Sequence, residues 1–549
     1  MMTDEYDAIV AGAGAGGMMA AWGLIQGGMR VLLLERGPRF NPGRDYTVGI
    51  DGFEFRRPFA KYLPDTWHAV SKPYPRNYDH LRTNLYPTPQ QREIIYERAC
   101  GVGGSTLRYH GEAHRFPPAA FRTGTLYGKG VDWPLTYEDL AQYYEMAELL
   151  LGVAGQPHPA FPMKGLYPNP PHPLSPSSRL IASGCRKMGF ELWANPLAIL
   201  SRPYQGRLPC VYCKSCIDGC VVGDKSSVDI AVLPQIEASG RLTLRPGMAV
   251  LQVLLDGRDK ARGVLAADVK TGKLESLSAK TIILALGAIE TPRLLLNSSC
   301  ARYPQGLCNS SGLVGAYLME NIHAGVLFYL DGKMDTYKGL PIDGKVFDFM
   351  VPKAGAEPPI GFTMSAFGAP DFAKEPSTFA LWLAKGYGKA HRKFVEKYFG
   401  AHVMVFATAE HIPNESNKLT LSEYKDRFGF SKALLNVDLN ADDVHMLEKM
   451  LRLCADLASA SGAVKTAGQM TSVDDASASH VGGTARMGPN AGTSVVNGYG
   501  QSHDIKNLFI TDASVLPTQG PGLSPSLTIQ ALALRTADFI VREAKRQNL

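Results

Sequence analysis

The feature that most constrains this chain is a glycine turn between apolar segments near its start. Residues 8–11 are apolar and partly β-branched, residues 12–17 read Gly-Ala-Gly-Ala-Gly-Gly, residues 18–27 are compatible with a helix, and residues 31–34 form a second apolar run. A strand, a turn, a helix and a buried strand in this order make a βαβ unit of a parallel sheet. The sequence therefore predicts an α/β fold that begins with this unit.

The glycine turn has the GxGxxG spacing of a dinucleotide-binding site. Gly12, Gly14 and Gly17 would allow a tight bend, a close approach of the backbone to a pyrophosphate, and close packing of helix on strand. The N-terminus of the next helix would face the phosphates. At the end of the second strand, Glu35 can accept hydrogen bonds from ribose hydroxyls, and Arg36 follows it. The spacing does not distinguish FAD from NAD, and a glycine-rich turn without a ligand is the alternative.

Several later segments carry further motifs beside this glycine turn. Residues 100–116 contain a second glycine-rich loop, whose backbone can approach a flat or anionic group closely. Residues 287–296 form a third strand-to-helix turn, and residues 312–319 contain another pair of glycines. Residues 507–512 read as a strand that ends in a carboxylate, and a long helix follows. Five ordered segments are a far more specific signal than one glycine motif.

In these segments the chain resembles the glucose–methanol–choline (GMC) oxidoreductase family, from its first strand to its last helix. The resemblance implies a Rossmann-like FAD-binding domain of the p-hydroxybenzoate hydroxylase type, with an α+β substrate domain built on an antiparallel sheet. It places Gly103, Gly104 and Ser105 near the pyrophosphate or the isoalloxazine ring, and Asp512 near the diphosphate or the ribityl chain. Some relatives attach FAD through a histidine where Arg108 stands here, so we expect non-covalent FAD.

The expected domains follow from the same segments. Residues 1–320 are expected to form the FAD-binding domain, with an irregular excursion at 38–95 and a cysteine segment at 205–225. Residues 321–465, which are aromatic-rich and β-prone, are expected to form the substrate-binding domain. Residues 466–549 are expected to return to the FAD-binding domain and to carry the catalytic histidine.

The catalytic candidate is His480, which begins a His-Val-Gly-Gly-Thr motif. A neutral imidazole can accept the hydroxyl proton of an alcohol while hydride leaves the carbon. The resemblance implies that this histidine faces the flavin N5 atom. The family usually adds an Asn or a second His where Ser524 stands here, and a serine is a weaker base, so His480 would carry more of the chemistry. His110 and His503 are interpreted as structural.

Four cysteines lie within eleven residues, and they require a separate interpretation. Cys210, Cys213, Cys216 and Cys220 have the spacing C-x2-C-x2-C-x3-C, which can wrap thiolates around an iron–sulfur cluster. Tetrahedral zinc, a disulfide and no metal at all are the alternatives. The segment is similar to that of the iron–sulfur branch of the family, the flavoprotein subunits of FAD glucose dehydrogenase, fructose dehydrogenase and glucoside 3-dehydrogenase. The spacing differs from theirs, so both a 3Fe-4S and a 4Fe-4S cluster fit.

Together these features predict an FAD-dependent enzyme that oxidises a primary or secondary alcohol or a sugar hydroxyl. Hydride would pass to flavin N5 with His480 as the base. Electrons would then pass through the iron–sulfur cluster to an external cytochrome or quinone, with a small subunit as partner. The first alternative is an oxidase that uses oxygen and releases hydrogen peroxide. The second is a lyase on the same fold, which keeps FAD but performs no net redox chemistry.

Composition narrows the remaining functional classes. The net charge is +6 with the charges well mixed, and the absence of a long basic run argues against nucleic-acid binding. No apolar stretch reaches the ~18–20 residues of a membrane span. Strand-like sequence starts almost at once, so no signal peptide is recognised. The expected location is the cytoplasm, or the periplasm if a signal-bearing partner exports the chain.

Overall fold

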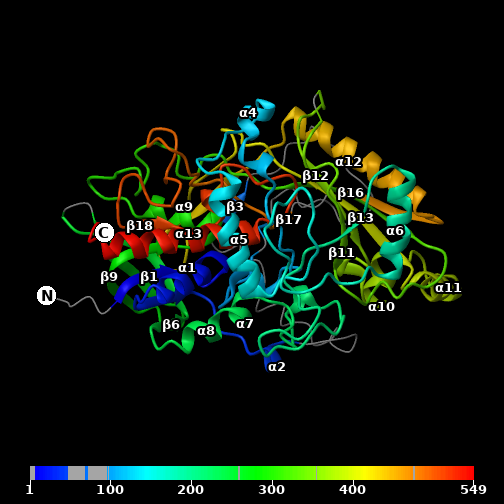
Figure 1. The fold of residues 1–549 in the computed structure, drawn as a ribbon, viewed down its shortest axis with the longest axis horizontal. Helices are drawn as coiled ribbons and strands as arrows, with labels where there is room; N and C mark the ends of the chain where they lie inside the picture. Colours follow the sequence, from blue (N-terminus) through cyan, green and yellow to red (C-terminus); the bar gives the residue numbers. More distant parts are fainter. Residues whose placement is uncertain are drawn as a thin grey trace.

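The computed structural model describes residues 6–46, 69–71, 95–96, 98–257, 260–353, 355–473 and 477–549. Within these residues the chain forms a seven-stranded sheet and a six-stranded sheet, with helices packed on both. The two sheets lie toward opposite ends of the molecule, and β1 and β9 of the first are on the left of Figure 1, whereas β11, β13 and β16 of the second are on the right.

The first sheet has a parallel part and an antiparallel part. Strands β6, β2, β1, β9 and β18 are parallel neighbours, and β9 continues into an antiparallel meander with β8 and β7. The strands of this sheet are β1 (Tyr6–Ala11), β2 (Val31–Glu35), β6 (Leu242–Pro246), β7 (Met248–Leu255), β8 (Ala261–Asp268), β9 (Leu274–Leu284) and β18 (Leu508–Ile510). All five residues of β2 are buried, as expected for a parallel strand covered on both faces.

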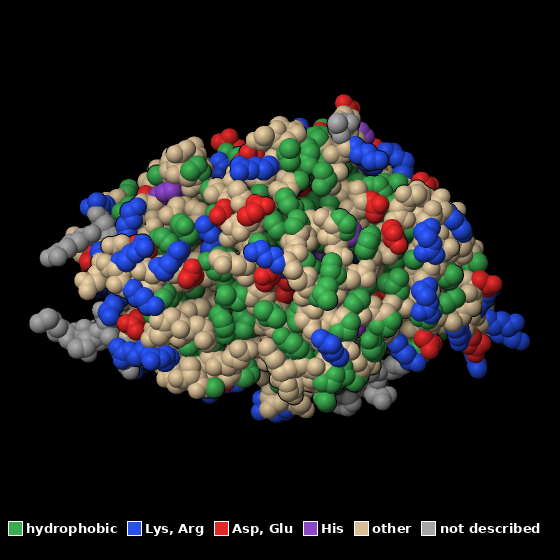
Figure 2. Space-filling view, in the orientation of Figure 1, with side chains coloured by type: hydrophobic (Ala, Val, Ile, Leu, Met, Phe, Trp, Pro, Cys, Tyr) green, Lys and Arg blue, Asp and Glu red, His purple; other side chains and the backbone are tan. Residues whose placement is uncertain are grey.

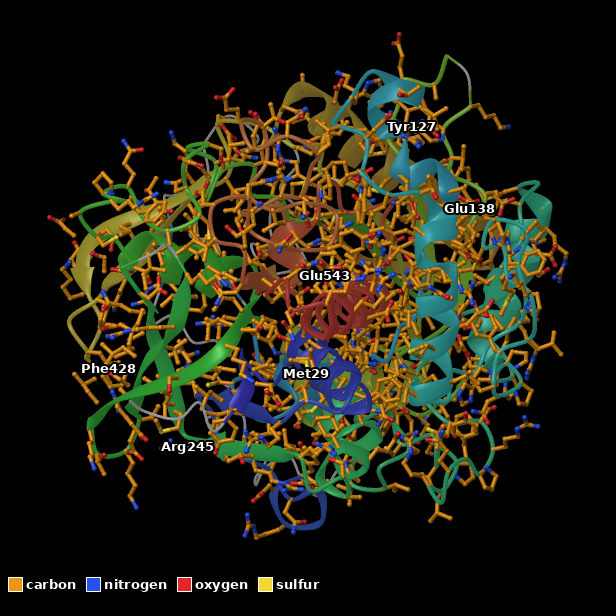
Figure 3. The ribbon with its side chains drawn as sticks, turned by 60° about the vertical axis from the view of Figure 1, so that its left-hand side comes forward. Met29, Tyr127, Glu138, Arg245, Phe428 and Glu543 are labelled. Carbon is orange, nitrogen blue, oxygen red and sulfur yellow. The ribbon has the colours of Figure 1, made fainter. Side chains whose placement is uncertain are left out.

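Two helices from opposite ends of the sequence cover this sheet. Helix α1 (Ala15–Gln26) packs against α13 (Ser526–Lys545), and α5 (Tyr137–Leu151) packs against α13 in turn. Figure 3 shows α13, which carries Glu543, directly beside α1 and the following residue Met29. The C-terminal helix therefore returns to the glycine turn that opens the fold, as the sequence predicts.

The second sheet is antiparallel, with the order β16-β10-β13-β12-β11-β5. Its strands are β5 (Trp193–Ala194), β10 (Ile322–Tyr329), β11 (Ile342–Val346), β12 (Phe362–Phe367), β13 (His402–Ala409) and β16 (Lys465–Thr471). Helices α6 (Pro176–Lys187) and α12 (Ala441–Ala460) pack on this sheet, and their apolar side chains share one core with it. The predicted fold class, an FAD-type α/β domain with an antiparallel second sheet, is confirmed.

The remaining elements are short. The helices are α2 (Pro42–Asp45), α4 (Thr123–Tyr127), α7 (Val228–Ala231), α8 (Leu233–Glu237), α9 (Gly287–Asn297), α10 (Pro376–Trp382) and α11 (Gly388–Tyr398). The 3₁₀ turns are η4 (Gly104–Leu107), η5 (Pro118–Phe121), η6 (Cys216–Asp218), η7 (Asp371–Ala373) and η8 (Ala513–Val515). The other strands are β3 (Ala69–Ser71), β4 (Ile95–Tyr96), β14 (Lys418–Lys425), β15 (Ser431–Asn436) and β17 (Ser477–Ala478).

The predicted domain limits remain a prediction. Strand β5 and helix α6 join the second sheet, although both precede residue 321. Most of the excursion expected at 38–95 lies outside the described residues. Among the described helices, none is long and apolar enough to cross a membrane. On the face shown in Figure 2, Lys and Arg side chains are interspersed with Asp and Glu.

A buried ion pair fixes α5 to the segment that follows the second glycine loop. The guanidinium of Arg115 is fully buried and binds the Glu148 carboxylate of α5 in a bidentate manner, at 2.7 Å from Nε and 2.6 Å from Nη2. Its Nη1 atom also donates to the Tyr137 hydroxyl at 3.1 Å. Because the pair is planar and fully hydrogen-bonded, it holds the loop in one orientation relative to α5.

Removal of either charged side chain of the Arg115–Glu148 pair should therefore destabilise the fold. We expect Glu148→Ala to lower the free energy of unfolding by about 3–5 kcal/mol, because it leaves the Arg115 charge buried without its partner. Glu396→Ala, which breaks an exposed pair with Arg392 on α11, is the control and should change stability little. Urea unfolding of both variants measures the difference. Equal stability of the two variants would show that the buried Arg115–Glu148 pair does not stabilise the fold.

Candidate active site

One large cleft, with a volume of about 680 Å³, runs between the two sheets from the glycine turn after β1 to the segment that holds His480. Its walls contain most of the residues predicted to bind FAD and both predicted catalytic residues. These predicted residues are Gly12, Gly14, Glu35, Arg36, Gly104, Ser105, His480, Asp512 and Ser524. Gly17 and Gly103 do not line the cleft and instead support its wall.

The first two glycine turns pack directly against each other. A Cβ atom on Gly104, where φ is +54°, would lie 2.6 Å from the Cα atom of Gly14. Gly103 donates its N–H to the Ala13 carbonyl at 2.9 Å, which joins the two turns by a hydrogen bond. A Cβ on Gly17 would lie 1.9 Å from the Gly12 carbonyl oxygen, so Gly17 is required for the packing of α1 on β1. Glycine is therefore required at positions 17 and 104.

Glu35 closes the first turn from the end of β2. Its Oε2 atom accepts the N–H of Ala13 at 3.0 Å, and its Oε1 atom accepts that of Gly37 at 2.8 Å. Burial raises the pKa of this carboxyl group, although both N–H groups act in the opposite direction. A carboxylate oxygen has two acceptor positions, so one on each oxygen remains for ribose hydroxyls.

Asp512 joins the third turn to the end of β18. Its Oδ2 atom accepts the Gly287 N–H at 2.9 Å and the Thr291 hydroxyl at 2.5 Å. Its Oδ1 atom accepts the N–H and the hydroxyl of Ser514, at 2.9 and 2.6 Å. These four donors fill the acceptor positions of the carboxylate. Asp512 therefore lies at the cleft, but it shapes the turn around Gly287 rather than offering a free oxygen.

His480 lies at the other end of the cleft, and its backbone is held on both sides. Its N–H donates to Oε1 of Glu320 at 3.0 Å, and its carbonyl accepts from the Gln519 amide. The imidazole itself makes no hydrogen bond to the residues that the structure describes. Burial lowers the pKa of His480 to about 4, with the nearby Glu112 carboxylate opposing the shift. The ring is therefore neutral at neutral pH.

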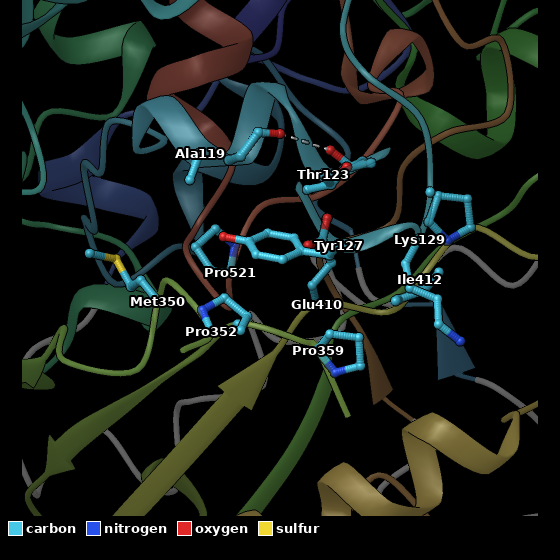
Figure 4. Close-up of a pocket in the computed structure, with 15 residues that line it drawn as sticks. Ala119, Thr123, Tyr127, Lys129, Met350, Pro352, Pro359, Glu410, Ile412 and Pro521 are labelled. Carbon is cyan, nitrogen blue, oxygen red and sulfur yellow. Dashed lines mark hydrogen bonds between the residues drawn. The ribbon is translucent and has the colours of Figure 1, made fainter. Parts of the chain in front are cut away.

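A small second pocket, with a volume of about 20 Å³, is lined by Glu410 and by Thr518 and Pro521 of the segment before α13 (Figure 4). Glu410 faces it and is buried, and its Oε1 atom accepts the N–H groups of Gln519 and Gly520 at 3.0 and 3.1 Å. Burial raises the pKa of Glu410 to about 7. Because Gln519 also donates to the His480 carbonyl, it connects Glu410 to the segment that holds His480. No sequence motif marked Glu410.

A buried polar network supports Ser524. Its N–H donates to Nδ1 of His114 at 3.2 Å, so the His114 proton must be on Nε2, which bonds to Oδ1 of Asn195 at 2.7 Å. The Asn195 amide then donates to Oε1 of Glu112 at 3.0 Å, and Lys345 donates to the same oxygen at 2.9 Å. Burial lowers the pKa of His114 to about 4, which keeps it neutral. Glu112 lines the cleft, and neither it nor Lys345 was predicted.

The two histidines interpreted as structural differ. His503 bonds to the Ser494 hydroxyl at 3.0 Å and lies outside the cleft. His110 lines the cleft, and its Nε2 atom lies 2.9 Å from Oδ2 of Asp371. Sequence reasoning missed this pair because Asp371 is 261 residues away in the chain, in a region without a motif.

The structure does not support the metal site predicted at the cysteine cluster. Among the described residues, no three or more His, Cys, Asp or Glu side chains gather in a group that could hold a metal ion, and all four cysteines of the cluster are free. The Cys220 thiol instead bonds to Oδ1 of Asp224 at 3.0 Å, and Cys210 accepts the N–H of Tyr212 at 3.3 Å. The iron–sulfur prediction for Cys210, Cys213, Cys216 and Cys220 is therefore not supported by the described structure.

The chain matches two family models described as GMC oxidoreductase, over residues 6–322 and 413–533. It is 32% identical to 2-methyl-1,2-propanediol dehydrogenase of Mycolicibacterium austroafricanum, over 98% of this chain and 96% of that protein. It is 30% identical to 6'''-hydroxyparomomycin C oxidase of Streptomyces lividus (97% and 91%) and 26% identical to the fructose dehydrogenase large subunit of Gluconobacter japonicus (99% and 99%). Formate oxidase of Aspergillus oryzae shares the fold, with a TM-score of 0.67 and 17% identity over 99% of both chains.

The contact between the glycine turns gives a test of FAD binding. Gly104→Ala should weaken FAD binding by at least about tenfold, or 1.4 kcal/mol, because the new methyl group pushes the second turn away from Gly14. Gly128→Ala is the matched control, since Gly128 also has a positive φ (+65°) but a Cβ there meets nothing within 4 Å. Flavin absorbance per mole of purified protein measures the result. Equal flavin content in the two variants would show that the contact is not needed.

Proposed function

The chain belongs to the GMC oxidoreductase family, and we propose that it is a dehydrogenase that uses His480 as the base while a primary or secondary hydroxyl is oxidised. The family and its relatives establish the broader class, an FAD-dependent oxidoreductase of alcohols or sugars. The observation that carries the finer proposal is the single cleft that joins the glycine turns to a neutral, half-buried imidazole.

The residues at one end of the cleft fit FAD. The glycine turns leave a backbone cradle that side chains would fill, and the N-terminus of α1 faces it, which suits a pyrophosphate. We assign the ribose to Glu35 and the ring system to the part of the cleft beyond Gly104 and Ser105. Arg108, which also lines the cleft, cannot form the histidyl bond, so the FAD would be held without a covalent bond. Bound FAD supplies the acceptor for hydride.

The other end of the cleft fits a hydroxyl group. The neutral His480 ring can accept the hydroxyl proton, and its hydrogen-bonded backbone fixes its position. The negative charge of Glu112 favours the protonated ring, so it would stabilise the imidazolium as the proton arrives. Ser524 can donate or accept one hydrogen bond from a buried position, which suits an orienting role.

We propose an external electron acceptor, such as a cytochrome or quinone, reached through a partner subunit. Two relatives carry names that denote one component of an assembly, the fructose dehydrogenase large subunit and the gluconate 2-dehydrogenase flavoprotein. The alternative is an oxidase, and two relatives favour it, 6'''-hydroxyparomomycin C oxidase and paromamine 6'-oxidase. Location in the cytoplasm, or in the periplasm with a signal-bearing partner, stays a prediction.

Flavin spectroscopy separates these functions. With oxygen excluded, we expect 2-methyl-1,2-propanediol, D-fructose or paromamine to bleach the visible absorption of the bound flavin. Air should then restore the absorption slowly, and the dye dichlorophenolindophenol should restore it quickly. Fast oxygen consumption with release of hydrogen peroxide would identify an oxidase. If neither these compounds nor a wider panel of alcohols and glycosides bleached the flavin, the proposed oxidation would be wrong and a lyase would become the better description.

The role of His480 has its own test. We expect His480→Ala to slow flavin reduction by roughly 10²–10⁴-fold, the usual contribution of a general base, without loss of FAD. In the unchanged enzyme the rate should fall as the pH is lowered through about 4, because the protonated ring cannot accept a proton. This acid limb should be absent from the residual rate of the variant. Reduction that was as fast in the variant as in the unchanged enzyme would exclude His480 as the base.

A further inference from the structure

The hairpin formed by α10 and α11 lies at the end of the molecule that carries the second sheet, on the right of Figure 1. Its tip is the segment Gly386-Tyr387-Gly388, in which both glycines have a positive φ, +91° and +68°. Tyr387 is 93% exposed, the highest value among the large apolar and aromatic side chains that the structure describes. Leu381, at the end of α10, is 78% exposed. One turn therefore presents two such side chains to solvent.

The outer face of α11 and its approach are strongly basic. Five exposed cationic side chains occur within residues 381–397, namely Lys385, Lys389, Arg392, Lys393 and Lys397. The single carboxylate of this segment is that of Glu396, which binds Arg392 at 2.7 Å. Lys389, Lys393 and Lys397 are spaced four residues apart and share one face of the helix, where like charges are destabilising. Lys and Arg side chains project at the right-hand end of Figure 2, where Figure 1 places α11. Folding therefore does not account for this lysine stripe.

The inner face of α11 is already used by the fold. The rings of Phe394 and Tyr398 lie 5.6 and 4.5 Å from that of Tyr329 in β10. Lys465 places its ammonium group 5.1 Å from the Phe394 ring and adds a further cation beside the helix. Helix α11 is thus attached to the second sheet by its aromatic side chains. The lysine stripe and the tip at Tyr387 are the parts that can meet another surface.

The residue types on this surface suit anionic lipid better than an acidic protein. Lys is a compact, strongly hydrated charge that needs no fixed geometry, which fits a layer of lipid phosphates. It is depleted at protein–protein interfaces, where Arg is enriched. Tyr is typical of the membrane–water interface, because its ring is apolar and its hydroxyl stays hydrated. A projecting tip also offers little of the roughly 1,200–2,000 Å² that a stable protein interface buries.

We propose that the α10–α11 hairpin docks the enzyme on the surface of an anionic membrane. The lysine stripe binds the lipid phosphates, and Tyr387 and Leu381 enter the headgroup layer. The protein lies on the bilayer in this arrangement and does not cross it. The proposal is independent of the proposed reaction, because binding to lipid requires no turnover.

Helix α10 connects this docking surface to the cleft. Phe372 lines the cleft, and its ring lies 6.4 Å from that of Trp382 at the end of α10. The same short helix carries Leu381, which enters the headgroups in this arrangement. Docking through the hairpin would therefore hold one wall of the cleft near the lipid surface.

Flotation of the FAD-loaded enzyme with lipid vesicles tests the proposal. We expect binding to phosphatidylcholine vesicles that contain about 30% phosphatidylserine, little binding to phosphatidylcholine alone, and release in about 0.5 M NaCl, because salt screens exposed charges. The double variant Lys389→Gln/Lys393→Gln should bind the anionic vesicles roughly 10- to 30-fold more weakly, since each lysine contributes about fivefold. Tyr387→Ser should weaken binding roughly three- to tenfold, because it removes the ring that enters the headgroups.

The control is Lys270→Gln/Lys273→Gln, which removes the same charge from two exposed lysines between β8 and β9, at the other end of the molecule. It should bind the vesicles as the unchanged enzyme does. Equal weakening by the two double variants would show attraction through net charge alone and overturn the proposal. Binding to poly-L-glutamate but to no vesicle would identify an acidic protein as the partner and would overturn it too.

A fluorescence measurement locates the side chain that meets the lipid. A tryptophan introduced by Tyr387→Trp should be quenched by anionic vesicles that contain brominated phosphatidylcholine, beyond the quenching of the enzyme's own tryptophans. One introduced by Leu274→Trp, at a site that is 55% exposed at the start of β9, should not be quenched. Because all the substituted side chains are exposed, flavin content and the urea midpoint should be unchanged. Equal quenching in the two tryptophan variants, or none at position 387, would refute docking through this hairpin.

Discussion

The contact between the two glycine turns is the constraint on which the rest of the site depends. Gly14 and Gly104 come from loops about 90 residues apart, and a single methyl group between them would force the loops apart. Their contact sets where the backbone can approach a pyrophosphate and where the loop continues toward His110 and Glu112. The backbone cradle that we propose for the cofactor and the wall of the proposed substrate end are therefore parts of one continuous loop.

The carboxylates near the glycine turns serve mainly to hold these turns in place. Glu35 holds the first turn through two backbone N–H groups, and Asp512 ties the third turn to η8 through four donors. At the substrate end the carboxylates act on imidazoles instead. Asp371 contacts Nε2 of His110, and the charge of Glu112 favours protonation of His480. The same side-chain type thus has a structural role at one end and an electrostatic role at the other.

The sequence was sufficient for the parts of the site that local rules govern. Glycine spacing located the turns, and the motif at His480 located one imidazole, since both signals lie within ten or so residues. The partners Asp371, Lys345 and Glu410 could not be predicted, because burial and long-range packing bring them to the cleft from β-prone segments without a motif. The cysteine spacing is also a local signal, but spacing alone does not show whether the thiols hold a metal. Asp224 and the Tyr212 N–H contact two of these thiols.

Lys225, which follows the four clustered cysteines, joins their segment to the second glycine loop. Its fully buried ammonium group donates to the carbonyl oxygens of Leu107, Tyr109 and Cys216. One positive charge therefore holds three separate backbone positions together. A structural cation often does the same in other proteins. Because this cation is covalently part of the chain, a chelator cannot extract it. The backbone at Leu107, Tyr109 and Cys216 is therefore held together by a cation that the chain itself supplies.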